Sequence, residues 1–256
     1  MITFIYDQSF EGLLCSVFEA YEQKIIPGNL LSENTPPTLF SERQVKITTD
    51  SNKARRVWKG LQKKISPAAL PSIPMTWQSE LPGSDWLLFQ YIYKVFKTPD
   101  SIELNFGDPI VLKVVQIAKK VHRERHRVIQ FLRFQKMADG TFFAATEPLY
   151  NVLPFTIEHL KNRFAGQTWI IYDMKRNYGY YYDQRQVKEV CFQQESPVLQ
   201  NNQPEQHLMD REELLFQKMW QEYFKTTCIK ERINPKLHRQ NLPVRFWKYL
   251  PEKNIK

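Results

Sequence analysis

The chain has 256 residues, of which 42% are hydrophobic and 14% aromatic, enough for one large domain or two small ones. Its 36 Lys and Arg outnumber its 27 Asp and Glu, so the formal net charge is +9. The three widely spaced cysteines exclude a disulfide framework and a zinc ribbon. Neither a signal-peptide pattern nor an apolar run of about 18 residues is present, so we expect a cytoplasmic protein that does not contact a membrane.

The positive charge is concentrated in two windows of the sequence. Residues 113–136 carry eight Lys and Arg with one acid, and residues 225–256 carry nine with two acids. Each window has a net charge of +7, so the net charge of the rest of the chain is 9 − 14 = −5. Such clustering favours binding surfaces for a polyanion, although two solvated helix faces would give the same pattern.

The first hundred residues predict strands and helices separated by proline-rich turns. Apolar positions after Ser9 recur at helical spacing, and Asp50 or Ser51 can cap a second helix. Cys15 falls within the first of these helices and is expected to be a buried thiol. The predicted elements are a strand at 2–6, a helix ending before Pro27, a strand at 45–49, a helix ending at Ile65, and a helix at 85–96.

The middle of the chain predicts a long helix followed by a hairpin. Asp108 and Pro109 form a helix start, with an N-cap acid before a proline. The apolar spacing changes to alternation at Val128, so we expect a strand over 128–134. Asp139-Gly140 is a turn signal, and residues 141–146 would form the return strand.

A second hairpin is predicted at 168–173 and 178–183, after a helix at 154–164 and before a strand at 187–192. The fold class that we expect is α+β: an antiparallel sheet built from two hairpins, surrounded by helices, with a basic helical C-terminal tail. We predict a main α+β domain at 1–194, a polar linker at 195–207, and a C-terminal helical basic segment at 208–256 that docks on the main domain.

The histidine pair on the predicted long helix does not favour a metal site. His122 and His126 are four residues apart, a spacing that can ligate zinc. Glu124 does not directly follow the first histidine, however, and Arg123 and Arg125 would oppose a dication. No phosphate-binding glycine loop or other cofactor motif is present, so we expect no metal ion and no cofactor.

Cations interleaved with aromatic residues suit nucleic acid, because cations contact phosphates and aromatic rings stack on bases. Most of the aromatic residues in the predicted sheet must nonetheless be core, since one face of the sheet has to be buried. The residues that we predict to contact nucleic acid, with DNA expected over RNA, are Arg123, His126, Arg127, Arg133, Arg176, Arg232, Lys236 and Arg239.

Two alternative functions remain open from the residues alone. The chain could be an enzyme acting on a nucleobase or a phosphodiester, with His126, Glu147 or Asp173 as general acid or base. Glu147 and Asp173 close predicted strands, where functional groups are often displayed. The chain could instead be an adaptor whose basic patches meet an acidic partner protein.

Several segments in combination make the chain resemble the bacterial family of probable DNA metabolism proteins. They are Y-D-Q-S-F-E-G-L-L-C at Tyr6–Cys15, H-R-V-I-Q-F-L-R-F at His126–Phe134, E-P-L-Y-N-V-L-P at Glu147–Pro154, H-L-K-N-R-F-A at His159–Ala165, W-I-I-Y-D at Trp169–Asp173, and K-E-R-I-N-P-K-L-H-R-Q at Lys230–Gln240. The resemblance covers nearly the whole chain.

This resemblance implies an accessory role in DNA repair or modification. Members of the family are associated with a radical SAM protein thought to act in DNA modification or repair, and longer relatives join a similar domain to a uracil-DNA glycosylase-like domain. The chain ends soon after Pro251, so we expect it to lack that glycosylase module, and it has no C-x-x-x-C-x-x-C motif. We therefore expect a nucleic-acid-binding accessory protein that acts with a radical SAM partner.

Overall fold

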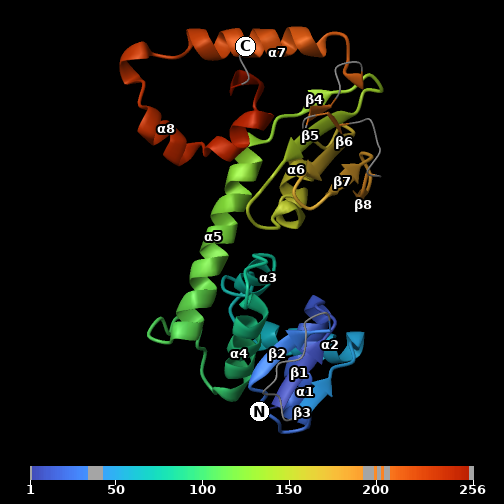
Figure 1. Ribbon diagram of the computed structural model, residues 1–256, viewed down its shortest axis with the longest axis vertical. Helices are drawn as coiled ribbons and strands as arrows, with labels where there is room; N and C mark the ends of the chain where they lie inside the picture. The colour runs from blue at the N-terminus through green and yellow to red at the C-terminus, as the bar shows by residue number, and fades with distance from the viewer. Residues whose placement is uncertain (1, 34–42, 193–198, 201–202, 205–207, 254–256) are drawn as a thin grey trace. The chain divides into compact units, whose positions relative to one another are not determined.

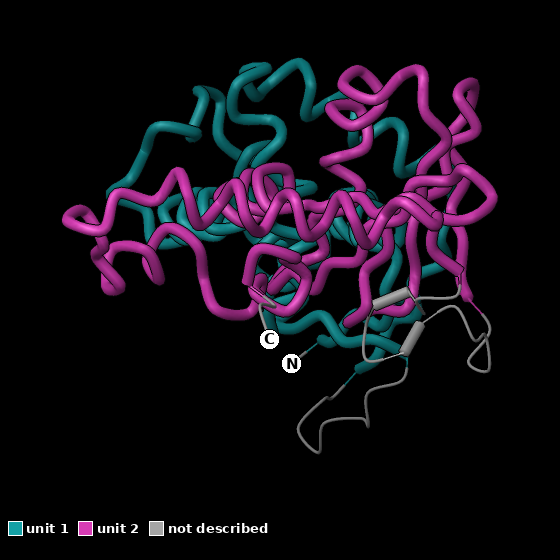
Figure 2. The backbone as a smooth tube through the Cα atoms, turned by 90° about the horizontal axis from the view of Figure 1, so that it is seen from above, with its two compact units in different colours: residues 1–122 teal, residues 123–256 magenta. Residues whose placement is uncertain are grey.

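The computed structural model describes residues 2–33, 43–192, 199–200, 203–204 and 208–253. Its internal contacts divide the chain into two compact units, residues 1–122 and residues 123–256 (Figure 2). The division falls inside one long helix, α5 (Pro109–Phe131). Among the helices of the described residues, none combines the length and the apolar composition that crossing a membrane requires.

Unit 1 contains a small parallel sheet, in which β1 (Ile2–Tyr6) lies between β2 (Asn29–Ser32) and β3 (Arg43–Lys46) (Figure 1). Phe4 and Tyr6 of the central strand are buried, as expected for an apolar strand with a neighbour on each side. The predicted strand at 2–6 is confirmed, whereas the strand predicted at 45–49 lies at 43–46.

The helices of unit 1 begin at the capping residues that the sequence indicates. The Ser9 hydroxyl accepts from the Gly12 N–H at 2.9 Å, and the Asp50 carboxylate accepts from the Asn52 N–H at 2.7 Å. The Asp108 carboxylate accepts from the Ile110 N–H at 2.9 Å, at the start of α5. The helices before α5 are α1 (Phe10–Glu22), α2 (Ser51–Lys64), α3 (Ser72–Trp77) and α4 (Ser84–Lys97).

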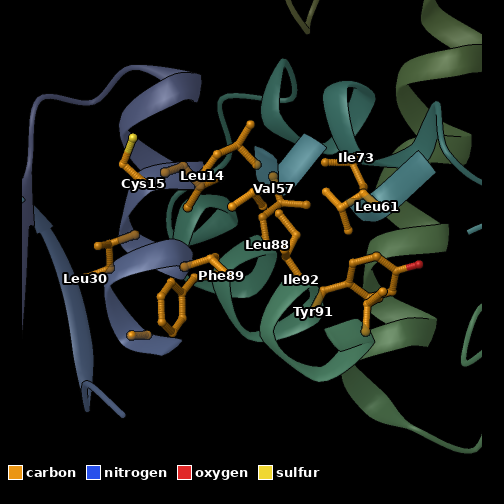
Figure 3. Close-up of a cluster of buried hydrophobic side chains, with 14 of the residues drawn as sticks. Leu14, Cys15, Leu30, Val57, Leu61, Ile73, Leu88, Phe89, Tyr91 and Ile92 are labelled. Carbon is orange, nitrogen blue, oxygen red and sulfur yellow. The ribbon is translucent and has the colours of Figure 1, made fainter. Parts of the chain in front are cut away.

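The core of unit 1 consists of apolar side chains from β1, β2 and helices α1 to α5. Figure 3 shows Leu14, Val57, Leu61 and Leu88 turned toward one another from three helices. Cys15 belongs to the same cluster and is fully buried, which confirms the prediction of a buried thiol.

Unit 2 is built on a five-stranded mixed sheet (Figure 1). Its strands, in spatial order, are β4 (Gln135–Lys136), β5 (Phe142–Thr146), β6 (Trp169–Asp173), β7 (Tyr178–Tyr182) and β8 (Val187–Val190). The hairpins β4–β5 and β6–β7 are antiparallel, and Gly140 has a φ of +84° in the first turn. The α+β fold with two hairpins is therefore confirmed.

The two hairpins join through a parallel pair, β5 and β6, so the sheet is mixed and not wholly antiparallel as predicted. The connection between these strands contains the short helices η1 (Leu153–Phe155) and α6 (Ile157–Arg163), as parallel strands require a crossover. The pairing brings the C-terminal ends of β5 and β6 to the same edge, with Thr146 opposite Asp173.

The strand predicted at 128–134 is wrong, because α5 continues to Phe131. Val121, Glu124 and Val128 are all buried. Their spacing of three and four places them on one helical face, so the apolar residues that alternate in the sequence also satisfy a helical period. On the β4 side of β5, the paired residues are Gln135 and Lys136.

The C-terminal segment is helical and packs against the rest of unit 2. It contains α7 (Glu213–Thr226), η3 (Lys230–Arg232), α8 (Pro235–Asn241), η4 (Val244–Tyr249) and η5 (Pro251–Lys253). Most of the predicted linker at 195–207 lies outside the described residues, apart from a strand pair, β9 (Leu199–Gln200) with β10 (Gln203–Pro204). The domain boundaries at 194 and 208 therefore stay a prediction.

Candidate nucleic-acid interface

The motif His126–Phe134 ends α5 and places Arg133 against the C-terminal segment. The Arg133 guanidinium donates to the Glu252 carboxylate at 2.8 Å and to the Gln130 carbonyl at 3.1 Å. Glu252 is buried, and it also accepts from the Trp220 indole N–H at 3.0 Å. One carboxylate therefore holds both an arginine and a tryptophan in place.

Arg133 and Trp220 line an open cavity of about 560 Å³. The Arg133 guanidinium carbon lies 6.0 Å from the centre of the Trp220 ring. Its Nε is buried and has no hydrogen-bond partner among the described residues. The side chains that line the cavity come from the segment between α5 and β4, from α7 and from η5, and they are Arg133, Phe134, Glu213, Phe216, Gln217, Trp220 and Pro251.

The cavity has the composition of a site for a flat, polar ring. Three aromatic side chains can present faces or edges to a base, and an arginine plane can stack on it or donate to its edge. Glu213 is buried and already accepts from the Lys136 N–H at 3.0 Å and from the Gln217 amide at 3.0 Å. The polar wall of the cavity is therefore fixed before any ligand enters.

A second cluster of charged residues lies where β5 and β6 end. Asp173 is fully buried and accepts from the Arg176 guanidinium at 2.8 Å and from the Lys175 N–H at 2.9 Å. Burial raises the pKa of Asp173, while the Arg176 guanidinium opposes that rise. Arg176 also donates to the Pro148 carbonyl at 3.2 Å, so this arginine joins the β6–β7 turn to the loop after β5.

Glu147 is the first residue of that loop, and its side chain contacts two residues of η4. Its carboxylate accepts from Lys248 and, at 3.1 Å, from the Tyr249 hydroxyl. The hydrogen bond from Lys248 lowers the pKa of Glu147 despite partial burial, and burial raises the pKa of Tyr249. The structure thus brings two of the predicted acid–base residues, Glu147 and Asp173, to one edge of the sheet and gives each a cationic partner.

The third predicted acid–base residue, His126, is exposed on α5 and lies 3.0 Å from the Gln130 amide nitrogen. Two helical positions earlier, Glu124 is buried and paired with Arg245, and its carboxylate lies 3.6 Å from Arg127. Glu124 also accepts from the Leu149 N–H at 2.9 Å. These contacts tie α5, the loop after β5 and the C-terminal segment together.

The eight residues predicted to bind nucleic acid divide into two groups. Arg127, Arg133 and Arg176 pair with buried carboxylates. The remaining five residues are exposed, and they are Arg123, His126, Arg232, Lys236 and Arg239. The described residues contain no group of three or more His, Cys, Asp or Glu arranged to hold a metal ion.

Sequence reasoning missed the residues that organise both clusters. Glu252 and Arg133 are separated by 119 positions, and no local pattern indicates that they pair. Trp220 sits in an amphipathic helix, where a tryptophan is ordinarily core. The basic and aromatic spacing of the tail does contain Lys248 and Tyr249, but it does not indicate that they contact Glu147.

The chain belongs to a family described as a domain of unknown function (DUF4130), which matches residues 82–252. A comparison with curated proteins found no match. A solved structure of a pGpG-specific phosphodiesterase, PggH from Vibrio cholerae, is similar over 71% of this chain and 81% of that chain. The identity is 11% and the TM-score is 0.35, a likeness too weak to support an argument.

Proposed function

We propose that the protein is a nucleic-acid-binding accessory of DNA repair or modification, and that its cavity beside Arg133 takes a base of single-stranded DNA. The observation that carries the proposal is the lining of that cavity. Arg133, Phe134, Phe216 and Trp220 supply one cation and three aromatic rings around a volume of about 560 Å³. A base must leave its duplex stack to enter such a cavity, which favours a single strand.

Exposed cations on η3 and α8, in the C-terminal segment that also contains α7, supply the phosphate contacts of the proposal. Lys236 and Arg239 are three residues apart on α8, so they share a helix face, and Arg232 precedes them in η3. All three are exposed. Cations of this kind fix a strand's backbone without reading its sequence.

The DNA-repair setting and the radical SAM partner rest on the resemblance of segments such as His126–Phe134 to the probable DNA metabolism proteins. The chain supplies no cluster-binding cysteine motif, so the partner would carry the chemistry. Affinity purification from the native cell, with and without nuclease, tests this partnership. A radical SAM protein should remain bound after nuclease treatment, and its absence in both conditions would contradict the partnership.

The base site is tested by fluorescence anisotropy with a labelled single-stranded oligonucleotide. Stacking contributes about 1–3 kcal/mol per base, so Trp220→Ala should weaken binding by about tenfold or more. Trp220→Phe keeps a ring while it removes the indole N–H, and it should retain most of the affinity. The matched control is Phe106→Ala, which removes an exposed ring from unit 1. Equal affinities for wild type, Trp220→Ala and Phe106→Ala would overturn the base site.

A further inference from the structure

Helix α7 packs against the rest of unit 2 through a face that carries polar side chains together with Trp220. Glu213 contacts the backbone of β4, and the Gln221 amide donates to the Pro251 carbonyl at 2.9 Å. Gln217 lies between them in the helical repeat and donates to Glu213. Because these positions are four apart, they lie on one face of α7, and Trp220 and Phe224 on the same face contact Glu252 and Lys253.

The apolar side of α7 is turned to solvent. Leu215, Met219 and Tyr223 have exposed fractions of 58%, 58% and 59%. They are also four apart and form one stripe, which we call the α7 stripe. Figure 1 shows α7 at the margin of unit 2, where the chain turns back through α8 to the last short helices. A surface helix ordinarily buries its apolar stripe, so an outward stripe indicates that another surface covers it.

The charge around the α7 stripe argues against a polyanion as its occupant. Residues 213–226 contain Glu213, Lys218, Glu222 and Lys225 as their charged residues, so α7 is neutral overall. The segment that follows, 227–241, has four Lys and Arg against one acid, a net +3. The phosphate groups of a nucleic acid or of an anionic lipid surface would be drawn to that segment rather than to the neutral α7.

We infer that the α7 stripe binds the same stripe of a second copy of this chain, with the two helices antiparallel. Lys218 and Glu222 lie one turn apart beside the stripe. In a parallel pair, the flank of the stripe that carries Lys218 and Glu222 would lie on opposite sides of the interface in the two copies, so these residues would not meet. An antiparallel pair centred near Met219 places Lys218 of one copy beside Glu222 of the other, twice, by the two-fold symmetry of such an interface. Antiparallel helix dipoles also favour this orientation.

The dimer should be weak and depend on concentration. A single pair of helices of 14 residues covers less than the roughly 1,200 Å² of a standard stable interface. We therefore expect a dissociation constant in the micromolar range. Leu215, Met219 and Tyr223 are not among the cavity's lining residues, although the Tyr223 ring stacks on that of Trp220, with ring centres 5.6 Å apart.

Sedimentation velocity over a range of micromolar concentrations of the full chain tests the dimer. Wild type should shift from monomer to dimer, and Met219→Glu should weaken the association by at least about tenfold, since it places a charge at the centre of the interface. The matched control is Leu104→Glu, which changes a residue of unit 1 that is 75% exposed and should leave association unchanged. Thermal unfolding checks that each variant folds.

A charge exchange tests the pairing of Lys218 with Glu222. Each single variant, Lys218→Glu or Glu222→Lys, should weaken the dimer because it places like charges together. The double variant should recover most of the affinity, which a merely structural effect on α7 would not give. Lys225 lies 3.6 Å from Glu222 within the same helix, so unfolding of the single variants is measured as well.

Disulfide trapping tests the orientation, in a background in which the exposed Cys191 and Cys228 are replaced by serine. Met219→Cys should form an intermolecular disulfide, because the two-fold axis brings position 219 of the two copies together. Leu215→Cys should not, since antiparallel helices separate the two copies of that position by about 12 Å. Disulfide formation at both positions would contradict the antiparallel pair. A monomer at every concentration, or no effect of Met219→Glu, would overturn the dimer itself.

Discussion

The strand ends of β5 and β6 and the cavity beside α7 both combine carboxylates, arginines and aromatic rings, yet they leave their arginines in different situations. At the strand ends, Arg176 is held by Asp173 and by backbone carbonyls, and its side chain is 11% exposed. At the cavity, Arg133 is fixed by Glu252 but still faces an open volume. The comparison shows that an arginine paired with a buried carboxylate can have two roles. It can be enclosed and stabilise the fold, or it can be held in one orientation at a cavity, and the open space beside the pair determines the role.

The largest effect that the comparison predicts is on stability at the strand ends. Asp173→Asn leaves the Arg176 guanidinium without its carboxylate in a buried position, so the free energy of unfolding should fall by about 3–5 kcal/mol. Chemical denaturation measures this change. The control is Asp183→Asn, which alters a partly exposed turn acid and should cost less. If the two variants were equally stable, the ion pair of Asp173 would not stabilise the fold as proposed.

A smaller effect concerns pH and Glu147. Its folded-state pKa is lowered from the usual 4.5, chiefly by Lys248, so the pair stabilises the folded state above that pH. As the pH falls through the lower folded-state pKa, Glu147 is protonated and the contribution is lost. Glu147→Gln should therefore melt below wild type at neutral pH. The difference should vanish in acid, and a difference that stays constant with pH would refute the linkage.

Local patterns in the sequence predicted most of the helices and the two hairpins of unit 2, because caps, turns and apolar spacing act over a few residues, but they did not predict the parallel strand pairs. Asp108 at the start of α5 and Gly140 in the first hairpin are examples. The residues from Val128 to Phe131 were predicted wrongly, because a short apolar run fits both the spacing of a helix and the alternation of a strand. Glu124 extends the buried face of the helix, but a glutamate does not indicate a buried position in the sequence.

The candidate site was predictable only in part. The motif around Arg133 and the basic tail could be picked out as charged and aromatic, but their use depends on long-range pairs such as Arg133 with Glu252 and Arg245 with Glu124. No sequence spacing encodes those pairs. The sequence therefore indicated which cations exist, and the structure separated those paired with buried acids from those that are exposed.

The salt dependence of single-stranded DNA binding tests the central claim most directly. With about 6 phosphate contacts, the log–log slope for wild type should be near −4, and replacing Arg232, Lys236 and Arg239 together by alanine should reduce its magnitude by about 2. The control replaces Arg55, Lys59 and Lys63, three exposed cations on α2, and should leave the slope unchanged. A flat response for wild type, or an equal change in the control, would contradict the account.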